Sequence, residues 1–313
     1  MIAILLRQIA TMALLIAVGV VLSRKGYLSE QGTKELGAIL LRLIIPCAIL
    51  LRLIIPCVII KSYIVPYTPE RAQALALSAG LALLGFVVAM AVAYAVFGKR
   101  RRMENFAAAF CNAGFIGIPL AQAAIGEEGV FYVAASVALL NLFQWTYGVY
   151  IMADRRDAIS ARNVVKNPVV IGIVIGVALF FSSLPVPEIV TSTLGYIAGM
   201  NTPVAMILMG TYLAKLSWRE MLDKRAYGCV AMRLTVIPAV ILLVFWLLPL
   251  GSGSTDVAMA AFLAAVTPVG ANICVFAQQY GCDYKLSVVT VCLSTVVSIV
   301  TVPALVALAQ MIL

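Results

Sequence analysis

Long apolar runs, rather than alternating or amphipathic patterns, dominate this chain. An α-helix needs about 20 mostly apolar residues to cross the hydrocarbon core of a bilayer. The runs predict ten such helices, at 2–23, 36–60, 73–97, 105–125, 129–153, 167–183, 188–214, 226–250, 257–280 and 285–310. The composition agrees, because 64% of the 313 residues are hydrophobic and only 11% are charged. We therefore expect an all-α integral membrane protein whose environment is the lipid bilayer.

Basic residues gather in every second loop between these runs. They follow the odd-numbered predicted helices, at Arg24, Lys25, Lys34, Lys99–Arg102, Arg155, Arg156, Arg162, Lys166, Lys215, Arg219, Lys224, Arg225 and Lys285. The other loops hold only Lys61 and Arg71. By the positive-inside rule the odd loops are cytoplasmic, which puts both termini on the non-cytoplasmic side of the cell inner membrane. The net charge of +9 then encodes topology, and we expect no nucleic-acid partner.

The predicted helices divide evenly into two halves. Residues 1–153 form a first five-helix repeat, 154–166 a cytoplasmic linker, and 167–313 a second repeat. Five helices per half force the second half to insert upside down, which is the inverted-repeat arrangement of many secondary transporters. One oddity is a tandem repeat, because AILLRLIIPC at 38–47 recurs at 48–57. Ten extra helical residues add about 15 Å to the second predicted helix.

The fourth and ninth predicted helices occupy matching slots in the two halves and carry the same breaking residue types. The residues in question are Asn112, Gly114, Gly117 and Pro119 in one, and Pro268, Gly270 and Asn272 in the other. Unpaired backbone groups are costly in lipid, so breaks persist where they are buried or line a watery cavity. Half-helix N-termini that meet at the midplane form an anion site. Kinking of a packed helix is the alternative for one break alone, but matching breaks favour a binding site.

Further polar residues lie inside the predicted spans. Asn141 and Gln144 share one face of the fifth helix and either line the site or join helices by hydrogen bonds. Among the intramembrane arginines, Arg52 is deep and Arg42 lies nearer the cytoplasmic end. A deep guanidinium favours an anionic ligand, and pairing with backbone carbonyls at a break is the alternative. Arg7 and Arg233 lie within about two turns of a helix end, where we expect them to snorkel.

Several residue types are absent from the predicted membrane interior. The chain has no histidine, and all thirteen acidic residues fall in loops or at helix ends. This argues against a cation substrate, a carboxylate proton relay and an enzyme that works by acid–base chemistry. The seven cysteines form no C-x-x-C pair and resemble buried apolar residues. We expect no metal site and no cofactor.

Three motifs resemble the auxin efflux carrier family, in its prokaryotic malonate-transporter-like branch. They are NAGFIGIPL at 112–120, NTPVAMILMGTYLA at 201–214 and TPVGANICVFAQQYG at 267–281. The resemblance implies crossing broken helices 4 and 9, a scaffold of helices 1, 2, 6 and 7, and a transport domain of helices 3–5 and 8–10. It also implies a homodimer, elevator-like alternating access and carboxylate substrates.

Carried over residue by residue, the resemblance assigns Asn112, Pro119 and Pro268 to the crossover, and Asn141 to a substrate-facing position. A basic residue four before a proline of the second helix fits either Arg42 or Arg52. The long central loop of plant members is missing, and the tandem repeat departs from the family pattern. We therefore expect a secondary transporter of a small organic anion. An anion channel or facilitator is the alternative.

Overall fold

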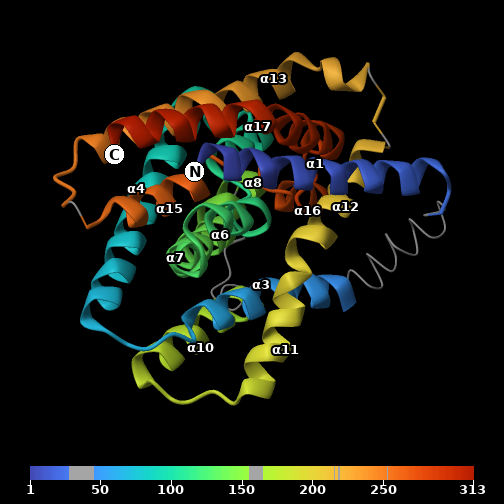
Figure 1. The fold of residues 1–313 in the computed structure, drawn as a ribbon. Coiled ribbons are helices and arrows are strands. Elements are labelled where there is room, and N and C mark those ends of the chain that lie inside the picture. The colour runs from blue at the N-terminus through green and yellow to red at the C-terminus, as the bar shows by residue number, and fades with distance from the viewer. Residues whose placement is uncertain (28–45, 155–164, 215, 218, 252) are drawn as a thin grey trace. The chain divides into compact units, whose positions relative to one another are not determined.

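The computed structural model of the chain describes residues 1–27, 46–154, 165–214, 216–217, 219–251 and 253–313, except for the side chains of 46–53 and Leu208. Apart from one isolated β-bridge, the regular structure of these residues is entirely helical (Figure 1). When directly successive helical elements are counted as one, six helical segments of the described residues are long and apolar enough to cross a membrane, and four apolar ones are shorter. The chain is thus an all-helical protein with several apolar membrane-length helices.

Contacts divide the chain into two compact units. The first unit consists of Met1–Gln8, Pro69–Val164 and Ser217–Leu313, and the second of Ile9–Thr68 and Val165–Leu216. Each unit therefore combines residues from both halves of the sequence.

The second unit is a layer of helices that pack through small residues. Its helices are most of α1 (Ile2–Arg24), α3 (Pro46–Tyr63), α10 (Pro168–Ser182), α11 (Glu188–Gly199) and α12 (Asn201–Ala214). Both α10 and α11 pack on α3. Gly172 and Gly176 face Pro56 and Tyr63, where an added Cβ would lie within 2.8 and 2.6 Å of their atoms. Such a small-xxx-small pair lets two helices approach closely.

The first unit contains the interrupted helices. Its elements in chain order are α4 (Pro69–Phe97), α5 (Arg102–Ala109), η1 (Ala113–Gly117), α6 (Ile118–Ile125), α7 (Glu127–Phe143), η2 (Gln144–Gly148), α8 (Val149–Ala153), η4 (Glu220–Leu222), α13 (Lys224–Ala231), η5 (Met232–Val236), α14 (Ile237–Trp246), α15 (Thr255–Ala265), α16 (Asn272–Gln279) and α17 (Tyr284–Ile312). α15 packs against α4 and α7, and α13 packs against α17. The core of this unit is therefore built around α15, the first half of a broken helix.

The described helices coincide with the predicted spans, with two differences. The predicted helix 188–214 is divided into α11 and α12 at Met200, because Pro203 has no N–H to donate to the carbonyl of Gly199. The predicted helix 36–60 is described only from Pro46 onward, so its first part lies outside the described residues. The predicted spans 105–125 and 257–280 are each interrupted, as their sequences predict. The inverted relation of the two halves stays a prediction.

Three π-turns widen helices in the described part of the first unit. Two of them, η1 and η5, end two residues before a proline, at Gly117 before Pro119 and at Val236 before Pro238. A proline lacks the N–H of the regular ladder and clashes with the preceding turn, and a π-turn accommodates the mismatch by one extra residue. The third, η2, begins at Gln144 and ends at Gly148. π-turns concentrate at functional sites.

Large apolar side chains are exposed on helices of both units. On α17, Val300 is 73% exposed and Met311 is 85% exposed, and none of the residues of α11 is buried. Apolar surface on this scale requires lipid or a protein partner to cover it. These surfaces agree with a multi-pass membrane protein.

Ion pairs connect the ends of several helices of the first unit. Arg225 of α13 donates to the buried carboxylate of Glu104 on α5 at 2.8 Å and also approaches Asp283, which precedes α17. Lys285 pairs with Glu220 at 2.6 Å, and this bond together with the Ser217 N–H lowers the pKa of Glu220 to about 2. The loops after the third, seventh and ninth predicted helices therefore lie at the same end of this unit.

Candidate functional site

The two helix breaks of the first unit pair with each other through their backbones. The N–H of Asn112 donates to the carbonyl of Pro268 at 2.9 Å, and the N–H of Gly270 donates to the carbonyl of Phe110 at 3.2 Å. Cys111 and Val269 thereby form an antiparallel bridge. Each break thus supplies hydrogen-bond partners for backbone N–H and C=O groups of the other. Lipid offers these groups no such partners.

Glycine makes this pairing sterically possible. A Cβ on Gly270 would lie 2.7 Å from the carbonyl oxygen of Cys111, a backbone atom that cannot rotate away. A Cβ on Gly117 would lie 3.4 Å from the Cα of Ala264, which is tight but close to ordinary contact. Gly270 is therefore the position at which the two breaks approach most closely, and Gly117 lets η1 pack on α15.

Three side-chain amides converge on the paired breaks. Asn112 immediately precedes η1, Asn272 is the first residue of α16, and Gln144 begins η2. The Asn272 Nδ2 donates to the Gln144 Oε1 at 3.0 Å. Gln144 is 1% exposed and Asn112 is 4% exposed, yet within the described residues neither the Gln144 Nε2 nor the Asn112 Nδ2 has a hydrogen-bond partner. Buried amide donors without partners mark a place where a ligand can bind.

The remaining predicted site residues have different surroundings. Gly114 is buried within η1, and Pro119 is buried at the second position of α6, where its missing N–H costs nothing. The buried Asn141 amide donates to the carbonyl of Val137 in its own helix at 2.9 Å. Arg42 and the side chain of Arg52 lie outside the described residues. The roles of these residues in binding stay predictions.

The structure corrects the interpretation of Arg233. This side chain does not snorkel to a helix end: it is 1% exposed and is the largest fully buried side chain of the described residues. Its Nε and Nη1 donate to the carbonyls of Thr267 and Ala108, each at 3.2 Å, and its Nη2 donates to the carbonyl of Ala265. The signal in the sequence was an arginine seven residues inside the apolar run 226–250, and an ionisable residue inside a membrane span is by default a hypothesis for a functional site.

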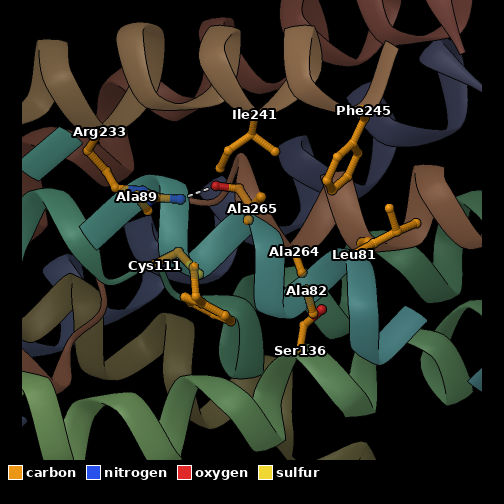
Figure 2. A pocket seen from close by; sticks show the side chains of 13 residues that line it. Leu81, Ala82, Ala89, Cys111, Ser136, Arg233, Ile241, Phe245, Ala264 and Ala265 are labelled. Carbon is orange, nitrogen blue, oxygen red and sulfur yellow. Dashed lines mark hydrogen bonds between the residues drawn. The ribbon is translucent and has the colours of Figure 1, made fainter. Parts of the chain in front are cut away.

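A small cavity adjoins Arg233. It is lined by Ser136, Cys111 and Arg233 together with apolar side chains from α4, α14 and α15, as Figure 2 shows. Its volume of about 20 Å³ is enough for one water-sized group and too small for a carboxylate ligand. This cavity is therefore not a carboxylate site, and among the three amides at the breaks Asn272 is the exposed one.

A serine that the sequence analysis did not single out supports the second break. The Ser294 hydroxyl of α17 accepts the N–H of the buried Val269 at 3.1 Å. We expect Ser294→Ala to lower the stability by about 1–3 kcal/mol, because it leaves this N–H without an acceptor. Thermal unfolding in detergent measures the effect. The matched control is Ser298→Ala, whose hydroxyl donates to the carbonyl of Thr295 in its own helix. Equal unfolding temperatures for the two variants would contradict the prediction.

Apolar membrane-length helices around paired, polar helix breaks define an integral membrane protein of the transporter class. Residues 4–306 match the family described as membrane transport protein. The chain belongs to this family, which confirms the resemblance to the auxin efflux carriers, and the family is one of membrane transport proteins rather than of enzymes. It is also 28% identical over 213 residues to the "Putative malonate transporter" of Rhizobium meliloti (strain 1021), and the match covers 65% of this chain and 65% of that relative.

Proposed function

We propose that this protein is a secondary transporter that carries a small organic anion, a carboxylate, and binds it at the paired breaks. The observation that carries the proposal is the pair of buried amide donors without partners, the Asn112 Nδ2 and the Gln144 Nε2. Amide donors suit the oxygens of a carboxylate. The name of the relative, which refers to malonate, supports the same substrate class.

The balance of charge at the breaks also favours an anion. Four helix ends meet there: the C-terminal ends of α5 and α15, and the N-terminal ends of the segments that begin at Ala113 and Asn272. The C-terminal ends are negative and the N-terminal ends positive. Arg233 binds carbonyls at both negative ends. The two positive ends and the amides therefore remain for a ligand, and they attract an anion.

The proposal includes alternating access of the elevator type. The transport domain of helices 3–5 and 8–10 moves against a scaffold of helices 1, 2, 6 and 7, and two chains form a homodimer. The division of the chain into compact units with nearly these boundaries supports this arrangement. The protein lies in the inner membrane of the cell. The end of the first unit that carries the ion pairs of Arg225 and Lys285 faces the cytoplasm. Both termini then lie on the opposite side.

A channel or facilitator is the second candidate. A channel conducts without a carrier cycle, so when the membrane voltage is clamped, unlabelled anion inside vesicles does not drive labelled anion to accumulate above its outside concentration. The broken helices in matching slots favour a carrier.

Counterflow in proteoliposomes tests the proposal. Vesicles are preloaded with malonate or another small carboxylate, and uptake of the labelled form is followed. Asn112→Ala and Asn272→Ala are each expected to lower the exchange rate about tenfold or more, because a hydrogen bond to a charged group contributes roughly 1.5–3 kcal/mol. The control is Gln279→Ala, an exposed amide at the far end of α16. No exchange by folded wild-type protein would refute the anion assignment, and wild-type rates in Asn112→Ala would remove the breaks from the site.

A further inference from the structure

The bonding of Arg233 differs from that of an arginine that binds a substrate. Every hydrogen bond that it donates goes to a backbone carbonyl, those of Thr267, Ala108 and Ala265, and no carboxylate of the described residues forms an ion pair with it. All three nitrogens of the guanidinium are engaged, and the side chain is 1% exposed. Figure 2 shows the guanidinium directed at the carbonyl of Ala265. Arg233 is therefore a positioning residue and not a direct ligand of a transported anion.

The carbonyls that Arg233 binds are of a particular kind. Ala108 lies in the last turn of α5, Ala265 ends α15, and Thr267 lies in the break that follows. Carbonyls at half-helix C-terminal ends and unwound backbone carbonyls are the groups that coordinate sodium ions in cation-coupled transporters. A guanidinium offers these oxygens one permanent positive charge and five N–H donors. Like a bound metal ion, the guanidinium gives these carbonyl oxygens a positively charged partner, but it cannot dissociate from the protein.

We propose that the Arg233 guanidinium is the resident cation of the paired breaks, so that anion exchange by this protein requires no bound sodium ion. The inference rests on the proposed carrier function. Arg233 holds the C-terminal ends of α5 and α15 together, and its charge offsets their negative ends in every step of the cycle. In a sodium-coupled carrier the ion must arrive before these carbonyls are satisfied, whereas here they are satisfied permanently.

The first test uses wild-type proteoliposomes with malonate counterflow in sodium, potassium or choline media. The expected rates agree within about twofold among the three media, because no metal ion takes part. Exchange that appears only with sodium would overturn the inference and leave the carrier function intact. Absence of exchange in all three media would instead refute the carrier function.

The second test removes the guanidinium. Arg233→Ala is expected to lower the exchange rate about tenfold to a hundredfold, because three buried carbonyls lose charged donors. Guanidinium ion added at millimolar concentration is expected to recover part of the rate, because it fits the space that the side chain vacates. Arg233→Lys keeps the charge and is expected to retain more exchange than Arg233→Ala. Asn112→Ala is the control, because guanidinium should not restore it.

A binding measurement separates this role from simple packing and does not depend on transport. The unfolding temperature of Arg233→Ala in detergent is expected to rise with added guanidinium or sodium ion, and that of the wild type is not. A folded Arg233→Ala variant that responds to neither ion, in stability or in exchange, would refute the resident-cation role. If that variant does not fold, the wild-type cation series decides the question, because a requirement for sodium there overturns the resident-cation role.

Discussion

Replacing Gly270 by alanine is expected to abolish carboxylate exchange and to lower the stability of the protein by about 2–3 kcal/mol. The new methyl group would lie 2.7 Å from the carbonyl oxygen of Cys111 and 3.3 Å from its carbonyl carbon. Both atoms belong to the backbone of the other break, so the breaks have to separate. The bond from the Gly270 N–H to Phe110 is then lost, and the amides near the breaks move.

Counterflow and thermal unfolding in detergent measure the two effects together. The control is Gly80→Ala on α4, where an added Cβ meets no atom within 4 Å. Gly117→Ala is expected to lower exchange and stability by amounts between those of Gly270→Ala and Gly80→Ala. The added Cβ would lie 3.4 Å from the Cα of Ala264. Normal exchange by Gly270→Ala would show that the close approach of the breaks is not needed for transport.

The second large effect is expected in the other unit, from Gly210→Ala. A Cβ on Gly210 of α12 would lie 2.2 Å from the carbonyl oxygen of Ile16 and 2.8 Å from the Cα of Gly19. The contact is reciprocal, because a Cβ on Gly19 would lie 2.3 Å from the carbonyl oxygen of Ile207. α1 and α12 therefore touch backbone to backbone, and a methyl group forces them apart. We expect a loss of about 3 kcal/mol or more of stability.

The two glycine variants are expected to differ in transport. Gly210 lies in the second unit, whereas the paired breaks lie in the first. The folded fraction of Gly210→Ala should therefore keep the wild-type KM for the anion while the yield of folded protein falls. Gly199→Ala, with no atom within 4 Å of the added Cβ, is the matched control. A raised KM with normal stability would contradict this assignment.

The sequence predicts the helices well because lipid imposes a simple rule on them. A run such as 73–97 must be helical in a bilayer, and α4 occupies Pro69–Phe97. The breaks follow from Pro, Gly and Asn in the runs 105–125 and 257–280. Their pairing does not follow, because a bond between Asn112 and Pro268 depends on how distant segments pack.

The candidate site is predicted less completely than the helices. Asn112, Gln144 and Asn272 are polar groups in apolar runs, which is a local signal. Arg233 is such a group too, but its distance from the helix end suggested snorkelling. Tertiary packing decides the outcome, since the carbonyls it binds belong to α5 and to α15 with the break that follows it. Ser294 gave no signal, because a serine in a membrane helix more often bonds its own backbone.

The π-turns determine where this chain can change in length. Deleting one residue from a regular α-helix rotates everything beyond it by about 100° and exchanges the buried face for another. A π-turn already carries one residue in excess, so a deletion there restores a regular helix and leaves the flanking faces in register. The turns at Gln144 and Arg233 are thus two places where the chain can shorten by one residue and keep its packing. Such a shortening would redirect the Gln144 and Arg233 side chains, so we expect a deletion at either turn to leave the protein folded and to lower anion exchange.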